Sequence, residues 1–183
     1  MNFVARISKN ESGNIVGRIG GNIPNELIIK TNELNGYLYY LTIESKDDEA
    51  KLISIFIYSD YDKRIEHRIY PEILVKVFLH NHDDESEIKD YTITELSKAN
   101  LIGYDEVDDE NFDFITLSDN PMLIQEEKYY YSELEKDGYK FFMQVDEFYY
   151  PENIVKDRFI FSGGALYLYR KNDEIIAGFW QFS

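Results

Sequence analysis

At 183 residues, with 44% hydrophobic and 16% aromatic side chains, the chain is long and apolar enough to fold as a single globular domain over residues 1–183, which excludes a disordered polypeptide. Its 19 Lys and Arg against 35 Asp and Glu give a formal net charge of −16, and a field of that sign disfavours direct binding to nucleic acid or to a membrane surface. The absence of cysteine excludes disulfides and thiolate chemistry, and it favours a reducing compartment such as the cytoplasm.

Short apolar segments with a period of two occur along most of the chain and predict β-strands. They are rich in Ile, Val, Tyr and Phe, and Gly, Asn, Asp or Pro residues bound them. The predicted strands cover residues 3–7, 37–43, 52–58, 73–79, 112–117, 139–145, 165–169 and 175–182. This pattern predicts a mostly β (α+β) fold built from antiparallel units, with one or two short helices.

Helical patterns are few. The clearest is Glu126–Lys136, where Tyr130 and Leu134 are four residues apart and so share one helix face. Residues 94–99 form a second, shorter candidate within a stretch of weak periodicity. No run of about 18 apolar residues predicts a membrane-spanning helix, and the N-terminal residues lack the pattern of an export signal.

Two strand segments of the chain repeat each other. Gly36–Glu44 (GYLYYLTIE) and Gly138–Asp146 (GYKFFMQVD) align at an offset of 102 residues, and a second Tyr-rich strand follows each of them. Duplicated units of this kind pack against each other around a shared core. We therefore expect pseudo-duplicated halves, roughly 1–60 and 118–183, joined by an acidic middle segment.

Four short motifs stand out near the two ends of the chain: Ile19-Gly20-Gly21 with Pro24, Asp119–Gln125, Phe141–Asp146 and Gly163–Tyr169. Together they resemble the YwqG-like bacterial family of unknown function, whereas residues 64–113 have no match in it. The resemblance implies a duplicated, mostly antiparallel β domain with few helices, and it implies no established activity. Related domains occur among bacterial proteins suspected of neutralising toxins, which is an analogy at the level of the fold.

Acidic residues are concentrated in the middle of the chain, where His80–Asp113 contains twelve acids and only two bases. Such a concentration attracts a basic protein and speeds its association. It favours a non-enzymatic, acidic binding protein or inhibitor, either an immunity protein against a toxin or a phage-type inhibitor of a nucleic-acid enzyme such as a CRISPR nuclease (an anti-CRISPR). An alternative is that the acids only keep a Tyr-rich and Phe-rich surface soluble. The predicted partner-binding residues are Asp105, Glu106, Asp108, Asp109, Glu110 and Asp113.

A second hypothesis is a small-molecule or carbohydrate-binding β domain. Gln144 and Asp146 are polar residues within a predicted strand and have tyrosines nearby. Polar groups beside aromatic rings are typical of ligand sites, although such aromatics also serve as core and cross-strand pairs. In this hypothesis Gln144 and Asp146 lie at the rim of a groove between the two β units.

Signatures of catalysis are absent from the sequence. It contains no GxSxG or HExxH motif and no cysteine, and the spacing of 35 acids cannot identify a pair suited to glycoside cleavage. The segment His80–Glu85 is the best metal candidate, because imidazoles two residues apart on a strand point the same way and carboxylates follow them, but it lacks a recognised third ligand. We predict no catalytic residue, no metal site and no cofactor.

Overall fold

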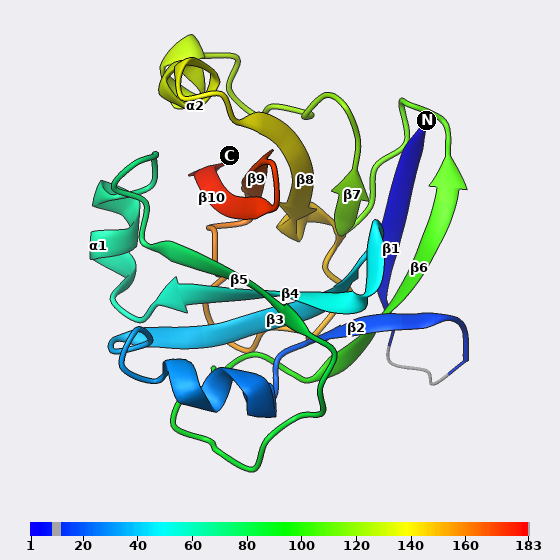
Figure 1. The fold of residues 1–183 in the computed structure, drawn as a ribbon, viewed down its shortest axis with the longest axis vertical. Coiled ribbons are helices and arrows are strands. Elements are labelled where there is room, and N and C mark those ends of the chain that lie inside the picture. Colours follow the sequence, from blue (N-terminus) through cyan, green and yellow to red (C-terminus); the bar gives the residue numbers. More distant parts are fainter. Residues whose placement is uncertain (9–11, 183) are drawn as a thin grey trace.

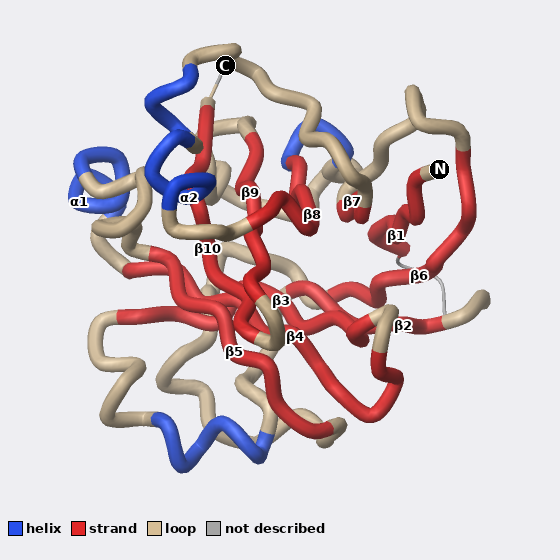
Figure 2. The backbone as a smooth tube through the Cα atoms, turned by 45° about the horizontal axis from the view of Figure 1, so that its top comes forward, coloured by secondary structure: helices blue, strands red, loops and turns tan. Residues whose placement is uncertain are grey.

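The structure, a computed structural model, describes residues 1–8 and 12–182. Ten strands form one antiparallel sheet in the order β10-β9-β8-β7-β1-β6-β2-β3-β4-β5 (Figures 1 and 2), which confirms the predicted mostly β fold. The strands are β1 (Asn2–Ser8), β2 (Ile15–Ile19), β3 (Tyr37–Ser45), β4 (Asp48–Tyr58), β5 (Val75–Asn81), β6 (Ala99–Val107), β7 (Ile115–Leu117), β8 (Lys140–Asp146), β9 (Ala165–Lys171) and β10 (Glu174–Gln181).

Two of these strands, β2 and β6, were not among the predicted ones. In β6 the inward positions Ala99, Leu101 and Gly103 are buried and alternate with less buried residues, but small side chains at two of the three positions weaken the period-two signal. The helix predicted at 94–99 is wrong, because β6 begins within this range and turns precede it. Leu96 is buried there and forms an isolated bridge, so tertiary packing overrides the weak helical propensity.

The described residues also contain five short helices. They are η1 (Asn25–Lys30), α1 (Tyr61–Glu66), η2 (Lys128–Tyr130), α2 (Ser132–Lys136) and η3 (Glu147–Tyr149). The predicted helix Glu126–Lys136 thus corresponds to η2 followed by α2, and Gly138 follows α2 with a positive φ of 85°. Among the described residues, no helix is long and apolar enough to cross a membrane.

The strand order divides into two five-stranded halves that meet where β1 pairs with β6. From this contact outwards, one half has the order β6-β2-β3-β4-β5 and the other has β1-β7-β8-β9-β10. Both halves carry the same irregularity: the register shifts between Tyr39 and Leu41 in β3, and between Phe141 and Met143 in β8, 102 residues later. β1 is the first strand of the chain, but it pairs with β7 and so belongs to the half of the sheet that contains the last strands. The two halves of the sheet therefore do not coincide with the first and second halves of the sequence.

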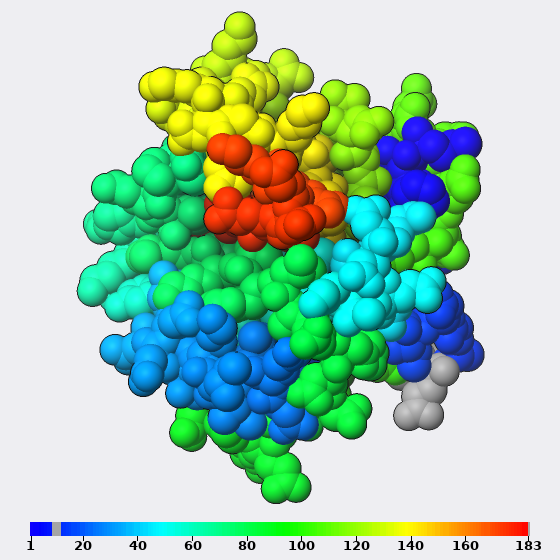
Figure 3. Space-filling view, viewed as in Figure 1, coloured from blue at the N-terminus to red at the C-terminus, as the bar shows by residue number. Residues whose placement is uncertain are grey.

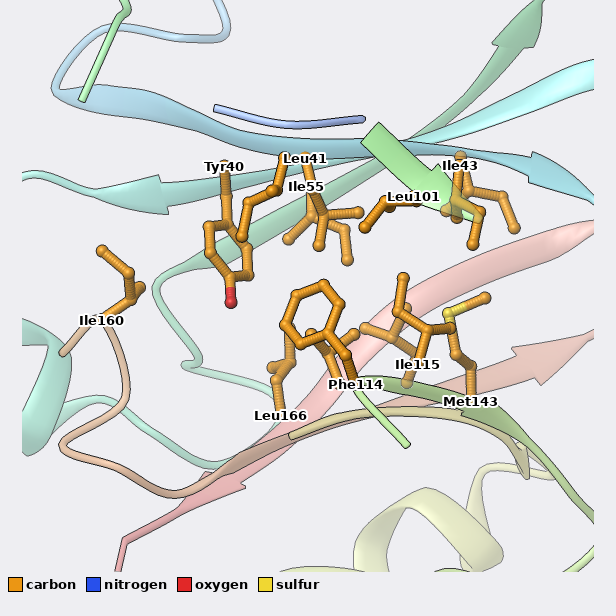
Figure 4. Packing of buried hydrophobic residues seen from close by; sticks show 14 of the residues in the cluster. Tyr40, Leu41, Ile43, Ile55, Leu101, Phe114, Ile115, Met143, Ile160 and Leu166 are labelled. Atoms are coloured by element: carbon orange, nitrogen blue, oxygen red, sulfur yellow. The ribbon is translucent and has the colours of Figure 1, made fainter. Parts of the chain in front are cut away.

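The main hydrophobic core lies between the two halves. Leu41 and Ile55, from β3 and β4, face Phe114, Met143 and Leu166 across the core (Figure 4). Two smaller clusters lie elsewhere in the two halves, one containing Leu27 from η1 and the other containing Tyr130 and Leu134 from η2 and α2. Each half therefore has a buried cluster of its own in addition to the core that both halves share.

The edge strands β5 and β10 lie next to each other, so the sheet curves almost back onto itself (Figure 1). Residues 68–70, which precede β5, cover part of the free edge of β10. The Tyr70 amide donates to the Gly178 carbonyl at 2.7 Å, and the Trp180 amide donates to the Arg68 carbonyl at 3.0 Å. These bonds satisfy backbone groups that would otherwise offer an open sheet edge.

Candidate functional site

The predicted partner-binding residues lie together where β6 ends and the chain turns towards β7. Asp105 and Glu106 belong to β6, and the exposed turn that follows carries the next three acids. Between Tyr104 and Asp113 the sequence contains no Lys or Arg. We call this surface the acidic ridge, and it consists of Asp105, Glu106, Asp108, Asp109, Glu110 and Asp113.

In the part of the chain that the structure describes, the ridge has two ion-pair partners, both from the beginning of the chain. Arg6 Nη2 lies 2.7 Å from Asp105 Oδ2, and Arg6 Nε lies 3.7 Å from Asp113 Oδ2. The N-terminal ammonium pairs with Asp109. Within residues 1–8 and 12–182, the other three ridge carboxylates form no ion pair, so the ridge keeps an excess of negative charge.

A second acidic turn lies close to the ridge. The turn between β3 and β4 consists of Lys46 and Asp47, and Asp48 and Glu49 follow at the beginning of β4. This hairpin lies beside β6 and β1: the Tyr104 hydroxyl donates to the Glu44 carbonyl at 2.6 Å, and Lys46 Nζ lies 3.7 Å from the ring centroid of Phe3. Figure 3 shows the cyan atoms of this turn beside the dark blue N-terminal residues, with green atoms on the other side of the latter. Asp47 is paired with Arg170, whereas the exposed Asp48 and Glu49 extend the negative surface.

Glu85, from the earlier part of the acidic segment, does not belong to this surface. The half-buried Glu85 accepts the Asn22 amide at 2.7 Å and also pairs with Lys98 and Arg18. Burial raises the pKa of Glu85, but the bonds from Lys98 and Asn22 and the charge of Arg18 outweigh it and hold the pKa below its ordinary value. The fold therefore separates Glu85, an internal ion-pair partner, from the ridge.

Gln144 and Asp146 lie inside the protein and have partners within the chain. The Gln144 side chain accepts the Met122 amide at 3.0 Å and donates to Asp146 at 3.2 Å. Asp146 also accepts the Phe148 amide at 2.9 Å and so caps η3. Both side chains are buried, so the structure places them in support of two connecting segments and away from the rim at which we expected them.

Sequence reasoning missed Glu147, the most unusual carboxylate of the molecule. It is 1% exposed and accepts three backbone amides, those of Ile160 at 2.7 Å and of Phe161 and Gly163 at 2.9 Å. Burial raises the pKa of Glu147 to about 7, against the opposing effect of these amides. Because the carboxylate is enclosed and its bonds hold the 160–163 loop, we assign it a structural role. No pattern distinguishes it among 35 acids.

The histidines are not arranged as a metal site. His80 is buried, with Nε2 2.7 Å from Ser54 Oγ and Nδ1 2.9 Å from the Asn81 carbonyl, whereas His82 is exposed beside Glu44. Burial lowers the pKa of His80, although the Asn81 carbonyl and Glu26 oppose this shift. Among the described residues, no group of three His, Asp or Glu side chains is placed to hold a metal ion.

No family model, curated protein or solved structure matches this chain. The resemblance to the YwqG-like family therefore stays a prediction. The acidic ridge is the part of the surface that differs most from an ordinary surface of mixed charge.

Proposed function

We propose that this protein is a non-enzymatic binding protein or inhibitor whose acidic ridge docks onto a basic surface of another protein. The observation that carries the proposal is the collection of six carboxylates at one end of the sheet, for which Arg6 and the N-terminal ammonium are the ion-pair partners among residues 1–8 and 12–182. Enzymes that bind nucleic acid need basic surfaces to hold phosphates. An immunity protein against a toxin and a phage-type inhibitor of a CRISPR nuclease would both use this complementarity.

The ridge is supported by regular structure. Along β6, Asp105 pairs with Val4 and Glu106 pairs with Phe3 of β1. Beyond the strand, the Asn2 side chain donates to the carbonyls of Asp109 at 3.1 Å and of Asn111 at 3.0 Å, which ties the turn to β1. A surface that is already ordered loses little conformational freedom on binding, so more of the electrostatic attraction contributes to affinity.

The distribution of charge favours a binding role over a general solubility role. A surface that serves only solubility usually has acids and bases interspersed, without a large region of one sign. Here the ridge is a run of one sign, and the β3–β4 hairpin, with Asp48 and Glu49, lies beside it. A field of one sign increases the association rate with a partner of the opposite sign, and salt weakens this effect.

The test compares wild type with a ridge variant and a charge-matched control. The ridge variant carries five changes: D105N, E106Q, D108N, D109N and E110Q. The control carries five changes at exposed acids elsewhere: D62N, E66Q, E126Q, E127Q and D173N. Each protein is immobilised and exposed to a host lysate at low and at high salt, and the retained proteins are identified by mass spectrometry.

We expect wild type and the control to retain the same basic protein at low salt, and the ridge variant to lose it. With the purified partner, the association rate constant should fall at least about tenfold in the ridge variant and should depend less on salt. Equal retention by the ridge variant would contradict the proposal, and so would equal losses in the two variants, because these would indicate net charge as the cause.

A further inference from the structure

A second feature of the surface is a cavity of about 580 Å³ beside α2 and the beginning of β8. Aromatic rings form much of its wall, and polar side chains surround them. The aromatic residues are Tyr131, Tyr139, Phe141 and Tyr169. The remaining lining residues are Asp119, Asn120, Pro121, Leu123, Glu135 and Lys140. Both the volume and the mixture of aromatic and polar groups suit a small-molecule site.

The rings of the wall are held in place by the protein. Phe141 lies edge-to-face against the buried Tyr169, with the ring centroids 5.8 Å apart. The Tyr139 hydroxyl donates to Glu174 at 2.5 Å, and the Tyr139 ring lies 5.8 Å from that of Tyr70. These contacts hold three of the four rings, those of Tyr139, Phe141 and Tyr169, so most of the aromatic wall is preformed and a ligand need not order it.

The charges around the cavity favour a positive ligand. Among the lining residues, Asp119 and Glu135 contribute two carboxylates against one ammonium, that of Lys140, and the chain as a whole has a net charge of −16. The faces of aromatic rings carry negative potential and attract cations. One ring of the wall already attracts a cation: the Lys171 ammonium, which lies outside the lining, is 5.6 Å from the ring centroid of Tyr139.

We propose that this cavity binds a small organic cation that carries a quaternary or methylated ammonium group. Aromatic walls attract such a cation over its whole surface, and the carboxylates compensate its charge. A primary ammonium is more strongly hydrated and loses more on entering. An anion meets repulsion both from the carboxylates and from the rings. The proposal does not depend on the acidic ridge, which contributes no residue to the cavity.

The first experiment titrates the purified protein with choline, in parallel with 3,3-dimethylbutan-1-ol, the neutral molecule of the same shape. Calorimetry gives the affinities, and nuclear magnetic resonance shows whether the signals of Tyr131, Tyr139 and Phe141 shift. We expect choline to bind at least about tenfold more tightly than its neutral counterpart. Equal binding of both compounds, preferential binding of a neutral sugar such as glucose, or no choline binding up to about 10 mM would overturn the proposal.

Two pairs of variants separate binding from folding. Y131L removes an aromatic ring from the wall and Y131F keeps it, so choline affinity should fall at least about tenfold in the first and stay within about threefold in the second. E135Q should weaken binding by a few fold, whereas E133Q, on the same helix but not lining the cavity, should not. Circular dichroism checks that each variant is folded. Full choline affinity in both Y131L and E135Q would place the ligand elsewhere and reject this site.

Discussion

The two halves of the sheet have the same strand order but satisfy their buried polar groups in different ways. In the half that contains β3, β4 and β5, polar side chains bond to one another. The Tyr39 hydroxyl donates to Thr42 at 2.8 Å, Thr42 lies 2.6 Å from Ser54, and Ser54 lies 2.7 Å from His80 Nε2. The result is a chain of hydroxyl groups that ends on a titratable imidazole.

In the other half the corresponding side chains bond to the backbone. The strand registers match Thr42 with Gln144 and His80 with Gln181. Gln144 accepts one amide of the segment 122–125, and Gln181 accepts two more at 2.9 and 3.1 Å. These neutral side chains therefore bind a connecting segment, whereas those in the first half form a chain of their own.

This difference shows which features the strand order requires. Strand pairing depends on the backbone and on alternating apolar side chains, and both halves supply these. Any set of side chains that leaves no buried donor or acceptor without a partner can then fill the polar positions. We expect loss of Gln181 to cost more stability than loss of a hydroxyl in the other half, and we expect the hydroxyl chain that ends at His80 to depend on pH, whereas the neutral amides of Gln144 and Gln181 do not.

The largest predicted effect concerns Gln181. Q181L leaves the part-buried amide and carbonyl of Gln125 without their partner, whereas the Ile124 amide keeps the Tyr167 hydroxyl at 3.3 Å. Each unsatisfied group costs about 1–3 kcal/mol, so the free energy of unfolding should fall by on the order of 4 kcal/mol. S54A, in the other half, removes one hydroxyl from the chain and should cost about 1–2 kcal/mol. Denaturant titration of both variants measures the two losses. A larger loss of unfolding free energy in S54A than in Q181L would contradict the expected difference between the two halves.

The second prediction concerns Glu147, which lies 102 residues after Ser45 of β3 and has a carboxyl where β3 has a hydroxyl. The folded protein holds the pKa of Glu147 at about 7, above its ordinary value of 4.5. Its contribution to stability is therefore complete below pH 4.5 and is lost as the pH rises to 7. The stability of wild type relative to E147Q should fall by about 3 kcal/mol over this range.

Thermal or denaturant unfolding of wild type and E147Q at several pH values between 4.5 and 7.5 measures this difference. The comparison with E147Q removes the contributions of the other carboxyl groups. A difference between the two proteins that is constant with pH would show that Glu147 is ionised throughout the range and would refute the prediction.

A smaller pH effect of opposite sign is expected at His80. Because burial lowers its pKa in the folded protein, the contribution of the neutral imidazole is present above pH 6.5 and is lost as the pH falls below it. The Asn81 carbonyl and Glu26 partly compensate the proton, which limits the effect. H80Q introduces the amide found at Gln181 and should remove this pH dependence. Chemical shifts of the imidazole, followed with pH, provide a direct check.

The smallest effect is expected on the acidic ridge. D108N and E110Q together should change the free energy of unfolding by less than about 0.5 kcal/mol, because both side chains are exposed and form no ion pair within the described residues. Denaturant titration of this double variant measures the change. A clear loss of stability would mean that the ridge supports the fold, and it would weaken its assignment as a docking surface.

Local patterns were sufficient for much of the architecture. The predicted strands correspond to β1, β3, β4, β5, β7, β8, β9 and β10. The two missed strands contain Gly17 and Gly103, whose backbones approach neighbouring strands so closely that an added Cβ would lie 2.2 Å from the Thr42 carbonyl and 2.4 Å from the Val4 carbonyl, respectively. Close approach of this kind requires glycine and removes an apolar side chain from the pattern.

The candidate sites were only partly accessible to sequence reasoning. Charge is additive along the chain, so the ridge was visible as a run of acids. The cavity was not, because Tyr131 and Tyr169 are 38 residues apart and come together only when β8 and β9 pair. We expected Gln144 at the rim of a groove, whereas it is buried. Alternation along a strand shows which residues share a face, but it does not show what covers that face.

By itself, the sequence determined the β character of this protein, its few short helices and its acidic middle segment, because these depend on composition and on the period of nearby residues. Only the tertiary structure decided that β1 lies between β6 and β7, that Glu85 is an internal partner of Arg18, and that Glu147 is enclosed by backbone amides. These features depend on contacts between residues far apart in the chain, and no local pattern encodes which distant segments meet.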